Sequence, residues 1–285
     1  MKRLLVLLLL CAGIARAELL PEPGGRLLAT GGVTQIEGAG GGGLVPWALI
    51  AGYGTRDQTG LTVFYTQADP SDFRLHAAGL AVGIHDRVEL SIAQQRLGLG
   101  RTVAGESIDQ DMLGIKLKVL GDAVFDQDRW WPQIAIGAIY KHNNDMAVPH
   151  LLGAKRDADT DFYVAATKVY LAGLLGRNVL LNATLRATRA NQLGLLGFGG
   201  DNNDHYEVMA ESSVGVFLCD SLLLGAEYRQ KPDNLSAFRE QDFYDIYLAF
   251  VPNKRIAVTV AYAQLGQIAD KKDQEALYVS LQLSF

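Results

Sequence analysis

Apolar side chains alternate with small or polar ones along most of this chain, and this period of two constrains the fold more than any other feature. The C-terminus is the clearest case, where every second residue is large and apolar: Leu277, Val279, Leu281, Leu283 and Phe285. Successive side chains of a β-strand point to opposite faces, so such a segment predicts a strand with one apolar face. After the N-terminal stretch, no run of apolar residues is long enough for a transmembrane helix.

We count 14 segments of this kind, each about 9–13 residues long, which is close to the length that a tilted strand needs to cross a bilayer. They are residues 26–37, 46–55, 60–69, 73–84, 87–98, 110–121, 131–142, 161–173, 178–190, 206–218, 221–231, 243–252, 255–266 and 275–285. Short connections alternate with long ones, among them residues 100–109, 143–160, 191–205, 231–242 and 267–274. Short periplasmic turns and longer extracellular loops are typical of outer-membrane barrels. The sequence therefore predicts an all-β protein, a single antiparallel transmembrane β-barrel, with 14 strands as the first choice.

The N-terminal end of the barrel domain leaves an alternative open. Residues 26–43 contain a Gly-rich run, made by Gly38, Gly40, Gly41, Gly42 and Gly43. This stretch is either a first strand or a plug that folds into the lumen. In the second case, and with one more segment assigned wrongly, the barrel has 12 strands. An even number places both chain ends in the periplasm.

The first 17 residues have the pattern of a cleaved signal peptide. Lys2 and Arg3 precede an apolar stretch over residues 4–14, and Ala15-Arg16-Ala17 is a suitable cleavage site. The mature barrel domain is then residues 18–285, exported to the outer membrane. Its terminal Phe285 resembles the signal that the barrel assembly machinery of Gram-negative bacteria reads. This machinery and the outer-membrane lipid are the expected partners.

The charge of the chain argues against a nucleic-acid partner. With 26 basic and 31 acidic residues the net charge is −5, and removal of Lys2, Arg3 and Arg16 makes it −8. Nucleic-acid binding requires a basic face. The mature chain keeps one cysteine, Cys219, so the fold does not depend on an internal disulfide.

Charged residues on the polar faces of the predicted strands are candidates for lining the lumen: Glu89, Lys116, Lys118, Lys168, Arg186, Glu211, Glu227, Arg229 and Asp245. Both signs are present, and the three lysines could form a basic patch. These side chains either line a hydrated pathway or fill the interior as structural salt bridges. A barrel of 14 strands is too wide for side chains alone to fill, which predicts a pore, a ligand cavity or a plug.

Signals for catalysis or metal binding are weak. The five histidines form no His-Glu-x-x-His motif, and the acidic segments at residues 157–161 and 199–204 lack the ligand pattern of an EF-hand. The chain has no Gly-x-Ser-x-Gly motif, and no Gly-Lys-Ser/Thr follows the Gly-rich run. We therefore predict no enzyme activity, catalytic residue, metal site or cofactor.

Several short segments carry a resemblance to a known family: residues 27–33, 36–38, 41–47, 187–192, 194–200, 225–229, 231–235 and 252–254. Together they resemble an uncharacterised family of Gram-negative outer-membrane β-barrel proteins, described only as a domain of unknown function. The resemblance covers nearly the whole mature chain. It implies an exported barrel, supplies no catalytic residues and suggests that the Gly-rich segment has a built-in role.

These features predict a passive channel or transporter for small solutes, which the Gly-rich segment could gate. One alternative is a non-conducting structural or adhesion barrel whose extracellular loops bind a partner. Another is an enzyme that modifies lipid at the barrel rim.

Overall fold

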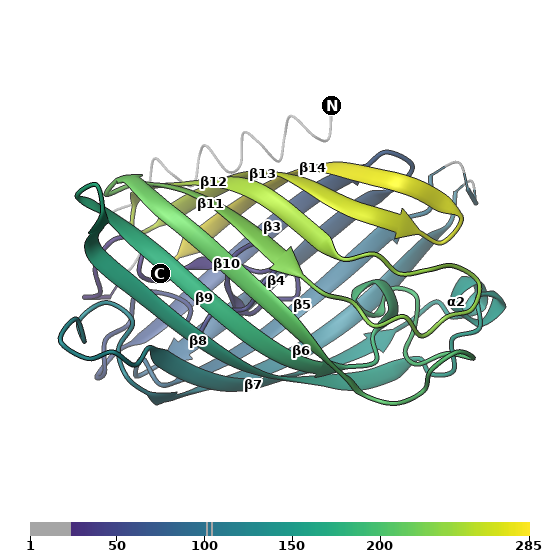
Figure 1. Ribbon diagram of the computed structural model, residues 1–285, viewed down its shortest axis with the longest axis horizontal. Helices are drawn as coiled ribbons and strands as arrows, with labels where there is room; N and C mark the ends of the chain where they lie inside the picture. The colour runs from purple at the N-terminus through teal and green to yellow at the C-terminus, as the bar shows by residue number, and fades with distance from the viewer. Residues whose placement is uncertain (1–23, 101, 104) are drawn as a thin grey trace.

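Twelve antiparallel strands close into one barrel in the computed structural model, which describes residues 24–100, 102–103 and 105–285 (Figure 1). The strands are β3 (Thr59–Pro70), β4 (Arg74–Ile84), β5 (Val88–Gly98), β6 (Ser107–Leu120), β7 (Gln133–Asn143), β8 (Ala158–Leu174), β9 (Arg177–Thr188), β10 (Glu207–Cys219), β11 (Leu222–Arg229), β12 (Phe243–Asn253), β13 (Ile256–Ile268) and β14 (Lys271–Ser284). Each strand pairs with its neighbours in the chain, and β14 pairs with β3 to close the wall. Closure satisfies the strand edges, which a barrel in lipid requires. The predicted signal peptide, residues 1–17, lies outside the described residues.

The prediction of 14 strands is wrong. Residues 26–37 and 46–55 are not part of the wall, and two short strands, β1 (Val33–Thr34) and β2 (Gly40–Gly41), pair with each other instead. Positive φ angles at Ala29, Gly32, Gly38 and Gly52 turn the backbone out of the extended conformation. Pro46 has no N–H to donate to a ladder. The barrel wall has 12 strands, the number given by the alternative prediction.

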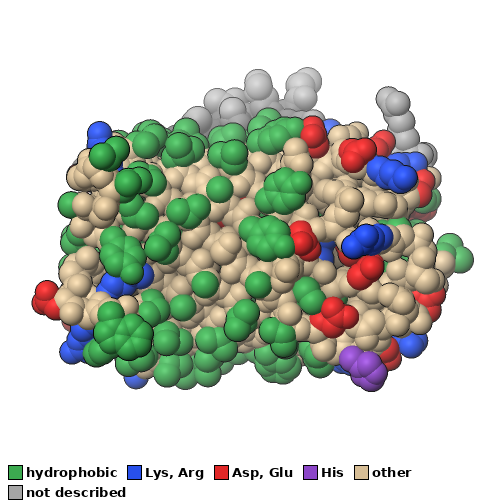
Figure 2. All heavy atoms as spheres, viewed as in Figure 1, with side chains coloured by type: hydrophobic (Ala, Val, Ile, Leu, Met, Phe, Trp, Pro, Cys, Tyr) green, Lys and Arg blue, Asp and Glu red, His purple; other side chains and the backbone are tan. Residues whose placement is uncertain are grey.

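The alternation in sequence gives the wall an apolar outer face and a mixed inner face. In β12, Tyr244, Ile246, Leu248 and Phe250 are exposed, whereas Asp245 and Tyr247 are buried. Figure 2 shows hydrophobic side chains spread over the outer surface of the strands, and charged side chains mostly towards the two ends. This arrangement suits a wall that is surrounded by lipid.

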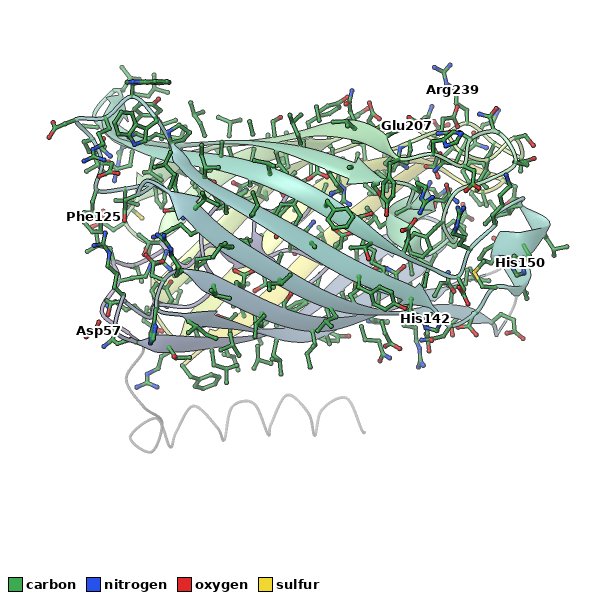
Figure 3. All side chains as sticks on the ribbon, turned by 90° about the horizontal axis from the view of Figure 1, so that it is seen from below. Asp57, Phe125, His142, His150, Glu207 and Arg239 are labelled. Atoms are coloured by element: carbon green, nitrogen blue, oxygen red, sulfur yellow. The ribbon has the colours of Figure 1, made fainter. Side chains whose placement is uncertain are left out.

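The two ends of the barrel differ. Figure 3 labels Asp57 and Phe125 at one end, and His142, His150, Glu207 and Arg239 at the other. The second end carries the long connections at residues 144–157, with the short helix α2 (Ala147–Leu151), at 189–206, with the 3-10 turn η2 (Asn191–Gly194), and at 230–242. The long loop predicted at residues 267–274 is wrong, because β13 extends to Ile268 and β14 starts at Lys271. No helix among the described residues is long and apolar enough to cross a membrane.

Phe285 closes the seam of the wall. Its N–H donates to the carbonyl of Leu61 over 2.8 Å, and the N–H of Leu61 donates back over 3.0 Å. The last residue of the chain is thus bonded to the first wall strand. Its role as an assembly signal stays a prediction.

Candidate functional site: the filled lumen

An N-terminal segment occupies the inside of the barrel. Residues 31–54, here called the luminal segment, are all buried. The segment enters and leaves at the same end, because the N–H of Arg26 donates to the carbonyl of Tyr53 over 3.2 Å. The Arg26 side chain holds this entrance closed through the carbonyl of Ile50, at 2.7 Å, and through a salt bridge to Asp86, at 3.3 Å. The segment is therefore a closed loop that is inserted into the lumen.

The predicted plug glycines all lie in the luminal segment, and their missing side chains let the backbone approach the wall. A Cβ atom on Gly42 would lie 2.0 Å from Oε1 of Glu227, and one on Gly40 would lie 2.9 Å from Oε2 of Glu89. A Cβ on Gly41 would lie 2.4 Å from the carbonyl of Val45 within the segment itself. The Gly-rich composition is thus required by close backbone contacts.

Glu89 and Lys116 on the wall bind the backbone of the luminal segment. Glu89 accepts hydrogen bonds from the N–H groups of Gly40, at 2.9 Å, and Ala51, at 2.7 Å. Lys116 donates to the carbonyls of Gly40 and Leu49 at 2.7 and 2.9 Å, and forms a salt bridge of 3.0 Å with Glu89. Both charges are compensated, and the wall satisfies the peptide groups of Gly40, Leu49 and Ala51 named here.

A larger charged group surrounds Glu37 of the luminal segment. Its carboxylate pairs with Lys141, with Arg186 at 3.4 Å, and with Arg229 at 2.8 Å, and its side chain is 0% exposed. Burial opposes ionisation, but Arg229, Lys141 and Arg186 outweigh it and hold the pKa of Glu37 well below its usual value. Removal of one partner from a buried ion pair costs about 3–5 kcal/mol. Glu37 is therefore an electrostatic anchor of the segment.

The remaining predicted lumen residues are also buried, with distinct partners. Glu227 accepts from the N–H of Leu44 and from the Ser213 hydroxyl, both at 2.7 Å. Asp245 lies opposite Glu227 in the ladder between β11 and β12, and its Oδ1 has no hydrogen-bond partner in the part of the chain that the structure describes. Lys118 pairs with Asp86, and Lys168 donates to the carbonyl of Arg129 at 2.9 Å. The three lysines thus bind three different sets of acceptors.

A second insert fills the lumen from the opposite end. Residues 190–200, here called the inserted loop, are all buried, although the sequence predicted them mostly as part of an extracellular loop. Asn143 donates to the carbonyls of Gly194 and Leu195 at 3.1 and 2.8 Å, and Gln110 donates to the carbonyl of Leu193 at 3.3 Å. The two inserts share one wall residue, because Lys141 also donates to the Leu193 carbonyl at 3.1 Å.

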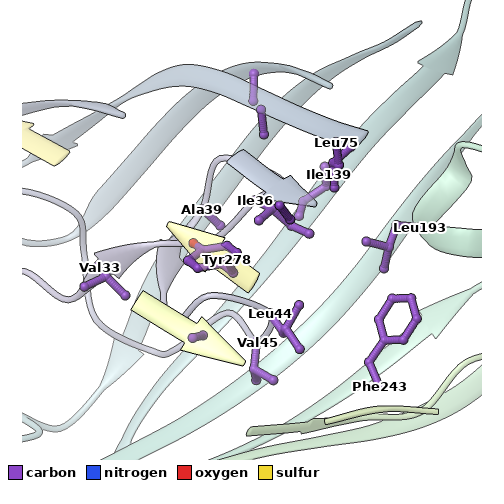
Figure 4. Close-up of a cluster of buried hydrophobic side chains, with 14 of the residues drawn as sticks. Val33, Ile36, Ala39, Leu44, Val45, Leu75, Ile139, Leu193, Phe243 and Tyr278 are labelled. Carbon is purple, nitrogen blue, oxygen red and sulfur yellow. The ribbon is translucent and has the colours of Figure 1, made fainter. Parts of the chain in front are cut away.

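Apolar side chains pack between the inserts and the wall. Figure 4 shows Ile36, Leu44 and Val45 of the luminal segment in a cluster with Tyr278 of the wall and with Leu193 of the inserted loop nearby. The three segment residues are 0–4% exposed. The lumen therefore combines a charged layer around Glu37 with apolar contacts that exclude water.

Sequence reasoning missed Glu37, Lys141 and Asp161 as members of the charged group. Lys141 could have been found, because it continues the inward positions Gln133, Ala135 and Ile139 of β7. Asp161 ends the acidic segment 157–161 and begins the predicted strand 161–173, but it is not among the predicted lumen residues, although it is the first buried residue of β8. Nothing in the sequence indicates that Glu37 contacts residues more than 100 positions away.

Comparison with known proteins identifies the fold and the family. The KdgM porin superimposes with a TM-score of 0.50 at 9% sequence identity, over 79% of this chain and 99% of that one, both alone and in complex with disordered oligogalacturonate. The outer membrane protein Omp33 of Acinetobacter baumannii gives a TM-score of 0.48 at 9% identity, over 79% of this chain and 97% of that one. No curated protein matches the chain. The family described as "Protein of unknown function (DUF3034)" matches residues 30–282, and this chain belongs to that family.

Proposed function

We propose that this protein is an outer-membrane channel in which the luminal segment closes the pathway and must move before small solutes can pass. The observation that carries this proposal is the position of the segment. It lies inside a wall whose hydrogen-bond ladder is complete without it. The segment can therefore leave without breaking the barrel.

The inner face of the wall supports the same proposal. Many inward residues are polar and buried under the inserts, among them Thr62, Thr66, Gln95, Gln133, Thr167 and Asn182. Water can satisfy these groups once the segment is displaced, so an open lumen does not leave polar groups without partners. An apolar inner face would instead favour a permanently filled barrel.

The orientation of the barrel in the membrane determines from which side the luminal segment enters the lumen. The short turns between β4 and β5 and between β8 and β9 lie at the same end as Arg26 and Phe285. Outer-membrane barrels place short turns in the periplasm. On this orientation the luminal segment enters from the periplasm, and the inserted loop folds in from the cell exterior.

A non-conducting structural barrel is the second candidate, and a specific observation favours it. The three cations around Glu37 face three carboxylates, those of Glu37, Asp161 and Glu211, so this layer is electrically balanced. A balanced, dry layer suits a permanent core as well as a closed gate. Conductance separates the two candidates.

Excision of the luminal segment is the direct test. Since Arg26 and Tyr53 are hydrogen-bonded, residues 27–52 can be replaced by two glycines without stretching the chain. We expect the excised barrel to conduct in a planar bilayer far more than the intact mature protein. A folded, excised barrel that does not conduct would contradict the channel proposal.

A reversible cross-link provides the control. A Cβ atom added to Gly38 would lie 3.6 Å from the Cβ of Ser91, within the range for a disulfide. Gly38→Cys with Ser91→Cys, in a Cys219→Ser background and combined with Glu37→Ala, should be closed when oxidised and conduct when reduced. Equal conductance in both states would mean that solutes pass without movement of the segment.

A further inference from the structure

The three cations that hold Glu37 come from three separate strands of the wall. Lys141 lies on β7, Arg186 on β9 and Arg229 on β11, and their side chains are 0–4% exposed. Glu37 is the one member of this group that comes from the luminal segment. We call the three cations the carboxylate cradle.

The carboxylate cradle contacts both carboxylate oxygens of Glu37. Arg229 contacts Oε2 of Glu37 through Nη1 at 2.8 Å and Oε1 through Nη2 at 3.1 Å. This parallel, two-bond geometry is how guanidinium groups recognise planar carboxylates. Lys141 adds a contact to Oε1, and Arg186 adds one to Oε2 at 3.4 Å.

The wall keeps the cradle in place without Glu37. Asp161 lies 2.7 Å from Lys141 and 3.2 Å from Arg186, and Glu211 lies 2.5 Å from Arg186 and 3.3 Å from Arg229. When Glu37 leaves, three cations face two carboxylates. The empty cradle then has a net charge of +1, which matches a monoanion better than a dianion such as a phosphate monoester.

We infer that the carboxylate cradle binds the carboxylate group of a solute, and that Glu37 fills it as an internal substitute while the channel is closed. This inference rests on the proposed channel function. It assigns monocarboxylates as the solute class. A solute carboxylate and Glu37 then compete for one site, so that binding favours the displaced segment.

Chemical rescue tests the cradle without any measurement of conductance. Glu37→Ala removes the carboxylate and leaves room for acetate. We expect this variant to unfold at a lower temperature than the unmodified mature protein, and sodium acetate to restore part of the loss. Acetamide, the neutral isostere, and sodium chloride at the same ionic strength should restore none of it.

Two matched variants make the rescue specific. Gln95→Ala removes a neutral hydrogen bond of 2.8 Å to the carbonyl of Ile36, next to Glu37, and acetate should not stabilise it. Arg229→Gln added to Glu37→Ala should abolish most of the acetate effect. Equal stabilisation by acetate in all three variants, or by acetamide in Glu37→Ala, would overturn the inference. If Glu37→Ala does not fold, the gluconate measurement below replaces it, because the excised barrel contains the cradle and lacks Glu37.

Conductance separates a failure of the cradle from a failure of the channel. In the excised barrel, gluconate should interrupt the current at concentrations at which glucose, a neutral molecule of similar size, has no effect. Arg229→Gln should weaken this block at least tenfold. Conduction without a gluconate effect would overturn the cradle alone, whereas acetate rescue in a barrel that does not conduct would overturn the channel alone.

Discussion

The luminal segment and the inserted loop fill the same lumen from opposite ends, but they are held by different chemistry. The luminal segment brings its own charge, Glu37, into a group of three wall cations. The inserted loop has no charged residue of its own and offers backbone carbonyls mainly to neutral wall amides such as Asn143 and Gln110. The strength of a charged contact depends on the pH and on competing ions, whereas the strength of a neutral hydrogen bond depends on them only weakly. In the proposed channel, the luminal segment is the part that moves and the inserted loop is the part that stays in place.

Glu37→Ala should produce the largest difference in local stability between the two inserts. It leaves Lys141, Arg186 and Arg229 with one carboxylate fewer, at a cost of about 3–5 kcal/mol. Hydrogen exchange measured peptide by peptide should become about a hundredfold or more faster in residues 35–47. Residues 191–198 should change much less. Equal acceleration in both inserts would mean that they open as one unit.

Acid should weaken the luminal segment. The folded-state pKa of Glu37 is lowered, so its stabilising contribution is complete above the usual glutamate pKa of 4.5 and is lost as the pH falls below that value. Glu240 accepts a hydrogen bond of 2.7 Å from Gln192 of the inserted loop, and its contribution to stability should change with pH in the opposite direction. Burial raises its pKa against the effect of Lys231, so acidification to 4.5 favours its folded state.

Hydrogen exchange between pH 7 and pH 3, corrected for the intrinsic rate, checks this contrast. Protection should fall in residues 35–47 below pH 4.5 and should be retained longer in residues 191–198. Glu37→Gln provides the control, because its luminal segment should lose this pH dependence. A segment that responds to acid in the control as it does in the unmodified protein would show that another group titrates.

Asn143→Ala should act on the inserted loop alone. The variant leaves the carbonyls of Gly194 and Leu195 without these two donors, at a cost of about 2–3 kcal/mol, and also loses the hydrogen bond that Asn143 accepts from the N–H of Asp145. Exchange should accelerate in residues 191–198, while the luminal segment keeps its protection. Faster exchange in residues 35–47 of similar size would mean that the loop supports the segment through Lys141.

Gly42→Ala should cause the smallest loss of stability among these variants. Its Cβ would lie 2.0 Å from Oε1 of Glu227, so the Glu227 side chain must shift, at a cost of about 1 kcal/mol. Gly98→Ala is the control, because its nearest neighbour, the carbonyl of Arg74, is 3.6 Å away. Thermal unfolding of both variants checks this prediction. Equal unfolding temperatures would show that the approach of the backbone to Glu227 is not tight.

The alternation in sequence predicted the wall well and the contents of the lumen poorly, for physical reasons. A wall strand such as β12 faces lipid on one side and the lumen on the other, so apolar and polar residues alternate along its own sequence. The predicted strand at residues 46–55 is apolar because it is buried inside the barrel, and short apolar runs do not distinguish these two environments. The pairing of Glu37 with Lys141, Arg186 and Arg229 depends on barrel closure, which no local pattern encodes.

The seam between β3 and β14 has a consequence for biogenesis. It joins the first wall strand to the last, and Phe285 is bonded to Leu61 across it. The luminal segment directly precedes β3 in the chain and enters the lumen at the end that carries Arg26 and Phe285. The ring of strands can therefore close first, and the segment, which stays attached to the seam, can be inserted into the finished barrel through that end.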